Sequence, residues 1–199
     1  MALLTMRASA GRGWSAVCRR CGWVLAVLLL GSSSTIIAAE TSLSAEYQVK
    51  AVFLFNFAQF VEWPATAFRE PQSPLVIGVL GEDPFGAYLD ELVSGEKVTE
   101  HPLQVRRYQR VEDIADCHIL FIGRMAPGQL ERIVAQLKKR SVLTVGDGET
   151  FTRQGGMVRF VTESGKIRLR INVEAAKACG LTISSKILRP ATIVTAEKE

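Results

Sequence analysis

The sequence predicts an α/β fold, with a single domain whose mostly parallel central sheet is flanked by helices and followed by a C-terminal antiparallel hairpin. Short, continuous apolar runs, typical of strands covered on both faces, alternate with helical segments in the middle of the chain. Elements in this order favour parallel strands joined by right-handed crossovers. Alternating apolar and polar residues around Ser164-Gly165 then indicate a hairpin.

An aromatic helix over residues 47–64 is the first element of the predicted domain. Pro64 ends it, because proline disfavours the helical conformation at Trp63 and cannot continue the hydrogen-bond ladder. Two apolar stripes recur at helical spacing, so the helix must be covered on two sides: Tyr47, Ala51, Leu54, Phe55, Ala58 and Val61 form one, and Phe53, Phe57 and Phe60 form the other.

The middle of the chain alternates predicted strands and helices. A second helix runs from about Asp83, an N-cap candidate, to Val93, and a third runs from Pro127 to about Lys139. The strand over 103–108 alternates in polarity and is expected nearer an edge of the sheet, whereas the other strands are buried. The four strands are Leu75–Leu80, Leu103–Tyr108, Cys117–Ile122 and Ser141–Val145.

A hairpin is expected from strands over 157–163 and 166–172. With a two-residue turn, one face is apolar and pairs Val158 with Ile171, Phe160 with Leu169, and Thr162 with Ile167. The other face pairs Arg159 with Arg170, Val161 with Arg168, and Glu163 with Lys166. Opposed arginines repel each other unless an acid reaches them. Either an acid of this chain neutralises them, or Arg159, Glu163, Arg168 and Arg170 form part of a surface that binds a partner. A short helix over 173–178 and a helix start at Ser184 or Ser185 follow.

The N-terminus has the features of a secretory signal peptide over residues 1–39. Four arginines precede the apolar run 21–30, and small residues near Ala39 offer a cleavage point. An uncleaved N-terminal anchor is the alternative, although the apolar run is shorter than a membrane span needs. Residues 40–199 then form the mature domain. No later segment reaches spanning length, so the mature chain is expected outside the cytoplasm without membrane insertion.

The charge and cysteine content bound the function further. The whole chain has 24 Lys and Arg against 20 Asp and Glu. The excess of four lies in the leader, so the mature part is neutral overall and gives no indication of nucleic-acid binding. Cys117 and Cys179 remain in an oxidising compartment, where a disulfide between them and two separate thiols both fit the sequence.

Each candidate catalytic, metal or cofactor motif lacks a residue or a spacing that its chemistry requires. His101 and His118 lack partners at metal-ligand spacing, and the glycines at 123 and 128 precede Gln129 rather than the lysine of a P-loop. Gly146 and Gly148 precede Phe151, where a dinucleotide fingerprint needs a small residue. The serines before Lys186 lack the spacing of a serine–lysine site. We therefore expect no enzyme, metal or cofactor.

Asp147 remains as a candidate polar residue at the end of a buried strand. It lies where α/β sheets often bind ligands, but a turn-forming Asp between two glycines explains it equally well. Phe53, Phe57 and Trp63 offer a second candidate, an apolar pocket at the end of the helix. Aromatic residues at helical spacing are more often core.

Six segments follow one another over nearly the whole mature chain: Tyr47–Pro64, Ile77–Gly86, Cys117–Ile122, Gly155–Phe160, Ile171-Asn172 and Gly180–Leu188. In this order and at this spacing they resemble the YfiR family. The resemblance implies a small periplasmic protein with an α/β core. It also implies a repressor that binds the periplasmic sensor region of an inner-membrane diguanylate cyclase, lowering cyclic-di-GMP and biofilm formation.

One residue departs from the family pattern. Some members have a cysteine in the first core strand that bridges to the position of Cys117, and Gly78 stands there in this chain. Two further questions stay open. The second wall of the aromatic helix is the apolar face of the hairpin, a second copy of the chain in a homodimer, or a partner. The alternative function is a periplasmic small-ligand sensor that uses the aromatic pocket.

Overall fold

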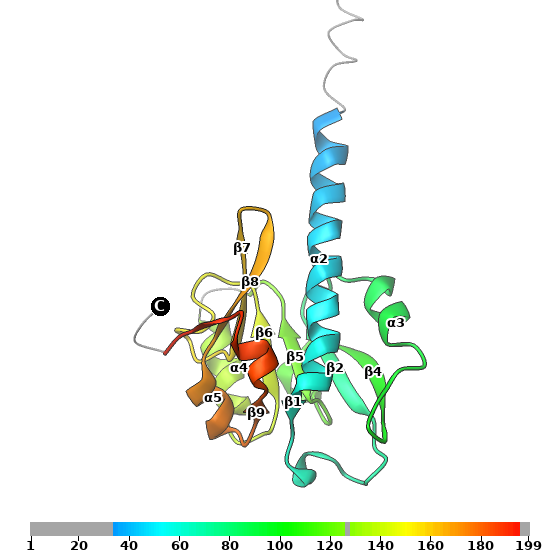
Figure 1. Cartoon of the computed structure of the whole chain (residues 1–199), viewed down its shortest axis with the longest axis vertical. Coiled ribbons are helices and arrows are strands. Elements are labelled where there is room, and N and C mark those ends of the chain that lie inside the picture. The colour runs from blue at the N-terminus through cyan, green and yellow to red at the C-terminus, as the bar shows by residue number, and fades with distance from the viewer. Residues whose placement is uncertain (1–33, 126–127, 196–199) are drawn as a thin grey trace, which may run out of the picture. The chain divides into compact units, whose positions relative to one another are not determined.

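The main sheet has the strand order β10-β8-β7-β6-β5-β2-β4-β3 (Figure 1). The computed structural model describes residues 34–125 and 128–195, with side chains from residue 45 onwards. The strands of this sheet are β2 (Leu75–Leu80), β3 (Lys97–Val98), β4 (His101–Tyr108), β5 (Ile119–Ile122), β6 (Leu143–Gly146), β7 (Val158–Glu163), β8 (Lys166–Ile171) and β10 (Thr192–Ile193). A separate antiparallel pair joins β1 (Val61–Glu62) to β9 (Thr182–Ile183).

Helices and short turns connect the strands. They are α2 (Ser34–Phe60), the 3-10 turn η1 (Ala65–Ala67), α3 (Ala87–Val93), the 3-10 turn η2 (Val111–Asp113), α4 (Gln129–Leu137), α5 (Val173–Ala178) and α6 (Ser185–Leu188). Most of the expected signal peptide lies outside the described residues, and residues 34–39 belong to α2. Residues 43–199 form one unit, to which the rest of the description refers. Among the helices of the described ranges, none combines the length and apolar character that crossing a membrane requires.

The strand directions confirm the predicted fold class. Strands β4, β2, β5, β6 and β7 run parallel to one another, whereas β3 pairs antiparallel with β4 and β8 pairs antiparallel with β7. The chain leaves β2 towards β4 but leaves β5 towards β6, so the order reverses between β2 and β5. In open α/β sheets, the carboxyl ends of the strands beside such a reversal often form ligand sites.

Two apolar clusters occupy the two faces of the sheet. The first buries Ala51 and Leu54 of α2 together with Leu89 of α3 against the strands. The second buries Ile133 and other residues of α4 against the opposite face. The alternation of side chains along each buried strand supplies both clusters, which explains why the strands are apolar throughout.

The hairpin has the register that the sequence predicts, from Val158 opposite Ile171 to Glu163 opposite Lys166. Its apolar face covers α2, since the ring of Phe160 lies 6.2 Å from that of Phe57 in a stacked arrangement and 5.9 Å from that of Phe53. The sequence left three candidates for the second wall of the aromatic helix, and in the structure the hairpin forms this wall.

Some expected boundaries were wrong. Helix α2 ends at Phe60, before Trp63-Pro64, because Val61 and Glu62 pair with β9. Asp83 caps the turn before α3 by accepting hydrogen bonds from Phe85 N and Gly86 N, and Gly86 is the N-cap of the helix itself. Residues 192–193, given no structure in the sequence analysis, form β10 beside β8.

Candidate functional site

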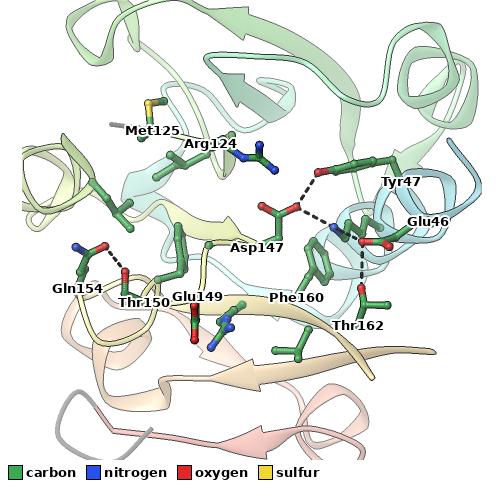
Figure 2. Close-up of a pocket in the computed structure, with 18 of the residues that line it drawn as sticks. Glu46, Tyr47, Arg124, Met125, Asp147, Glu149, Thr150, Gln154, Phe160 and Thr162 are labelled. Carbon is green, nitrogen blue, oxygen red and sulfur yellow. Dashed lines mark hydrogen bonds and ion pairs between the residues drawn. The ribbon is translucent and has the colours of Figure 1, made fainter. Parts of the chain in front are cut away.

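A pocket of about 730 Å³ lies at the carboxyl ends of β5 and β6. Four segments supply most of its lining: Glu46, Tyr47 and Lys50 of α2, residues 122–125 at the end of β5, residues 147–151 after β6, and residues 159–162 of β7. Gly128, Leu130 and Gln154 line the rest. In Figure 2 the side chains of Tyr47 and Arg124 extend towards Asp147. Because parallel strands end at a common edge, residues that directly follow β5 and β6 come together here although they are distant in sequence.

Asp147 fixes the helix to this edge of the sheet. Tyr47 donates its hydroxyl to Asp147 Oδ2 at 2.8 Å, and Lys50 Nζ donates to the same oxygen at 2.8 Å (Figure 2). Lys50 Nζ also forms an ion pair with Glu46 Oε1 at 2.7 Å. Thr162 of the hairpin donates its hydroxyl to that glutamate oxygen at 3.0 Å. The helix, the sheet edge and the hairpin are therefore joined by one polar network.

Lys50 is the most unusual member of this network, since only 4% of its side chain is exposed. A buried ammonium is costly unless it is paired, and here two carboxylates compensate it. The ammonium also lies 4.2 Å from the centre of the Tyr47 ring, a cation–π contact. The pKa of the Tyr47 hydroxyl is raised, first by burial and then by its hydrogen bond to Asp147, so this hydroxyl remains a donor.

The loop after β6 owes its shape to Phe151, which is buried against two glycines. A Cβ atom at Gly146 would lie 2.4 Å from the Phe151 ring, and one at Gly156 would lie 2.2 Å from it. Both distances are shorter than any side chain tolerates. Of the two glycines tested for a nucleotide fingerprint, Gly146 therefore makes room for a side chain of the protein itself.

The residues predicted as a partner surface fall into two groups. Arg168 and Glu163 are exposed, whereas Arg159 and Arg170 are half-buried. Arg170 Nη2 lies 3.6 Å from Glu163 Oε1, so an acid of this chain reaches one of the opposed arginines. Arg159 lines the pocket described above. The four residues thus share one face of the hairpin, but Arg170 contacts Glu163 of the same chain and Arg159 lines the pocket.

The three residues predicted to line an aromatic pocket pack elsewhere. Phe57 is buried with Phe53 against the hairpin, and the pocket at the sheet edge is lined by other residues. Trp63 instead contacts His118, and its Nε1 donates to the backbone oxygen of that histidine at 3.2 Å. For Phe57, this arrangement favours the core interpretation.

Cys117 and Cys179 are free thiols in the structure, so of the two alternatives it shows separate cysteines. Burial raises the pKa of the Cys117 thiol to about 12, which makes it unreactive near neutral pH. A Cβ atom at Gly78 would lie 2.8 Å from Cys117 Sγ.

His118 is a buried structural residue that precedes β5. Its Nδ1 accepts a hydrogen bond from Val76 N at 3.1 Å, and its ring stacks on Phe68 with centroids 4.4 Å apart. Burial lowers the pKa of His118 to about 4. In the described part of the chain, no cluster of His, Cys, Asp and Glu side chains is arranged to hold a metal ion.

The sequence analysis identified Asp147 but missed its partners on α2. Tyr47 was assigned to an apolar stripe, and Lys50 was given no functional role. A lysine directly before Ala51, on the apolar stripe of the helix, was the one available signal of a buried charge. Nothing local identified its partner, which lies 97 residues away in the chain.

A comparison with known protein families matches residues 47–192 to a family described as YfiR/HmsC-like. The matched region begins at Tyr47 and includes the hairpin and nearly all of the pocket lining. No protein of curated function matches the chain.

Proposed function

Because the chain belongs to the YfiR/HmsC-like family, we propose that it is a non-enzymatic periplasmic regulator that binds the periplasmic sensor region of an inner-membrane diguanylate cyclase. Binding represses the cyclase, which lowers cyclic-di-GMP and biofilm formation. The family match over residues 47–192 is the observation that carries this proposal. The absence of a recognisable catalytic motif in the sequence agrees with a binding function.

The exposed end of the hairpin supplies the partner surface in this proposal. Glu163, Lys166 and Arg168 are exposed there, on a strand pair whose opposite face is anchored on α2. Charges presented on a rigid element favour fast, oriented association with a complementary surface. Because Arg170 is paired with Glu163 within the hairpin, Arg168 is the residue with most to contribute to an acidic patch on the partner.

The test measures binding of the exported protein to the periplasmic segment of each membrane-anchored diguanylate cyclase of the same organism. Arg168→Glu should weaken binding to the cognate segment at least tenfold, since it places an acid against an acidic patch. Arg153→Glu is the matched control, because Arg153 is also exposed but lies outside the hairpin. Unchanged affinity for the first variant, or equal losses for both, would contradict the assigned surface.

A second variant tests the other two arginines of the predicted surface. Arg159→Glu with Arg170→Glu reverses both opposed charges, and it should weaken binding more than Arg168→Glu while also reducing stability, because both side chains are half-buried. Thermal unfolding of each variant separates lost binding from lost folding. Absence of binding to every cyclase segment by the unmodified protein would overturn the proposed function itself.

A further inference from the structure

We propose that the pocket around Asp147 is a binding site for a small, neutral, polyhydroxylated molecule of the size of a mono- or disaccharide. The proposal does not depend on the regulatory function above. It also differs from the aromatic pocket expected from the sequence, both in its place in the fold and in the chemistry that it offers.

The charges that line the pocket are balanced and interleaved. Glu46, Asp147 and Glu149 supply three negative charges, and Lys50, Arg124 and Arg159 supply three positive ones. A ligand anion held by Arg124 would approach the Asp147 carboxylate, and a ligand cation held by Asp147 would approach the Lys50 ammonium, 2.8 Å from that carboxylate. Like charges at such separations oppose binding. Neutral hydroxyl groups avoid both penalties.

Each of the two network carboxylates has capacity to accept a further hydrogen bond. Tyr47 and Lys50 both donate to Asp147 Oδ2, which leaves Asp147 Oδ1 without a bond from the other described residues. Lys50 and Thr162 both contact Glu46 Oε1, which leaves Glu46 Oε2 without a bond from the other described residues. Ionised carboxylates accept but never donate, so a ligand must bring hydroxyl or amine donors to these oxygens. Of these two donors, a neutral hydroxyl is favoured, because the nearby Lys50 ammonium repels a charged amine.

A donor for the ligand comes from the opposite side of the pocket. Arg124 follows β5, is exposed, and extends towards Asp147 and Tyr47 in Figure 2. A guanidinium carries five N–H donors in a planar fork, which suits the paired oxygens of neighbouring hydroxyl groups. Hydroxyls both donate and accept, so a polyol can bridge the carboxylates and the guanidinium at once.

The size and the walls of the pocket agree with this ligand class. Its volume of about 730 Å³ lies within the range of about 300–1,000 Å³ typical of small-molecule sites. Ile122, Phe151 and Phe160 contribute apolar surface beside the polar groups. Sugars have apolar C–H faces together with hydroxyl edges, and a pocket of mixed lining accommodates both.

The experiment is calorimetric titration of the full exported protein with glucose, galactose, N-acetylglucosamine, maltose and cellobiose. At least one of these sugars should bind saturably. Arg124→Ala should weaken that binding about tenfold or more, and Asp147→Asn should do the same. Arg153→Ala should leave it unchanged, because this exposed arginine is close in sequence but does not line the pocket.

Three results would overturn the proposal. The first is saturable binding of succinate, glycine or putrescine without binding of any sugar, and the second is no binding of any of these compounds. The third is sugar binding that Arg124→Ala and Asp147→Asn leave intact. If Asp147→Asn does not fold, Arg124→Ala gives the deciding result, because the Arg124 side chain is exposed. The titration contains no cyclase, so its result is independent of the test of the proposed regulatory function.

Discussion

The two ends of the packed part of α2 contact the same side of the sheet by different chemistry. At one end, Lys50 and Tyr47 bind Asp147 through hydrogen bonds and an ion pair. At the other, Phe57 packs in the core against Phe160. Burying an aromatic ring stabilises a fold directly, whereas burying an ion pair recovers little more than its desolvation cost. The difference indicates that the apolar end contributes more to the stability of the fold than the polar end.

Truncating the apolar end should give the largest loss of stability. Phe57→Ala removes a ring that is 1% exposed, and it should lower the free energy of unfolding by about 4 kcal/mol. Urea denaturation at neutral pH measures this change. Val52→Ala is the control, because this valine is exposed on the same helix and its truncation should cost less than about 0.5 kcal/mol. Similar losses for the two variants would contradict the assignment of Phe57 to the core.

Breaking the polar end should cost somewhat less. Lys50→Met leaves the carboxylates of Glu46 and Asp147 without their cation and should lower the free energy of unfolding by about 3 kcal/mol. This expected loss of stability is small for breaking a buried ion pair, because Glu46 and Asp147 are about a quarter exposed and water can partly solvate their charges.

A triple variant distinguishes charge from packing at this end. Adding Glu46→Gln and Asp147→Asn to Lys50→Met removes all three charges together, and most of the lost stability should return. Urea denaturation of the single and triple variants makes the comparison. A triple variant as unstable as the single one would show that the uncompensated carboxylates are not the cause of the lost stability.

Acid should weaken the apolar end through His118, which contacts Trp63. The pKa of this histidine is about 4 in the folded protein, below its ordinary value of 6.5. The unfolded chain therefore takes up a proton at a higher pH than the folded chain. The stabilising contribution is complete above pH 6.5 and is lost as the pH falls towards 4.

This loss should amount to about 1.4 kcal/mol between pH 7.5 and pH 5.5. His118→Asn removes the titrating group while keeping a side-chain acceptor near Val76 N, so its stability should change less over this range. Urea denaturation at the two pH values measures the difference. Identical pH dependence in both proteins would exclude His118 as its source.

Removing one hydrogen bond from the polar end should have the smallest effect. Tyr47→Phe deletes the hydroxyl that donates to Asp147 and should lower the free energy of unfolding by about 1 kcal/mol. Tyr88→Phe is the matched control: Tyr88 is also half-buried, and no described residue bonds its hydroxyl. Thermal unfolding compares the two, and an equal change in both would mean that the bond to Asp147 adds nothing.

Local patterns in the sequence were sufficient for much of the fold. The apolar run Leu75–Leu80 is strand β2 with the same bounds, and the Ser164-Gly165 turn fixed the register of the hairpin. Strand alternation and turn chemistry act over a few residues, so they can be read directly from the chain. Strand β1 and strand β10 were missed, because each has two residues and forms only by pairing with a distant segment.

By itself, the sequence determined the α/β class, the hairpin register and the family, since each follows from residues close together or from an ordered set of motifs. Only the tertiary structure decided that Lys50 is buried and that Asp147, 97 residues away, is its partner. Apolar periodicity reports which face of a helix is covered, but it does not report what covers a charge. That depends on which strand ends meet at one edge of the sheet, and there the structure places the pocket.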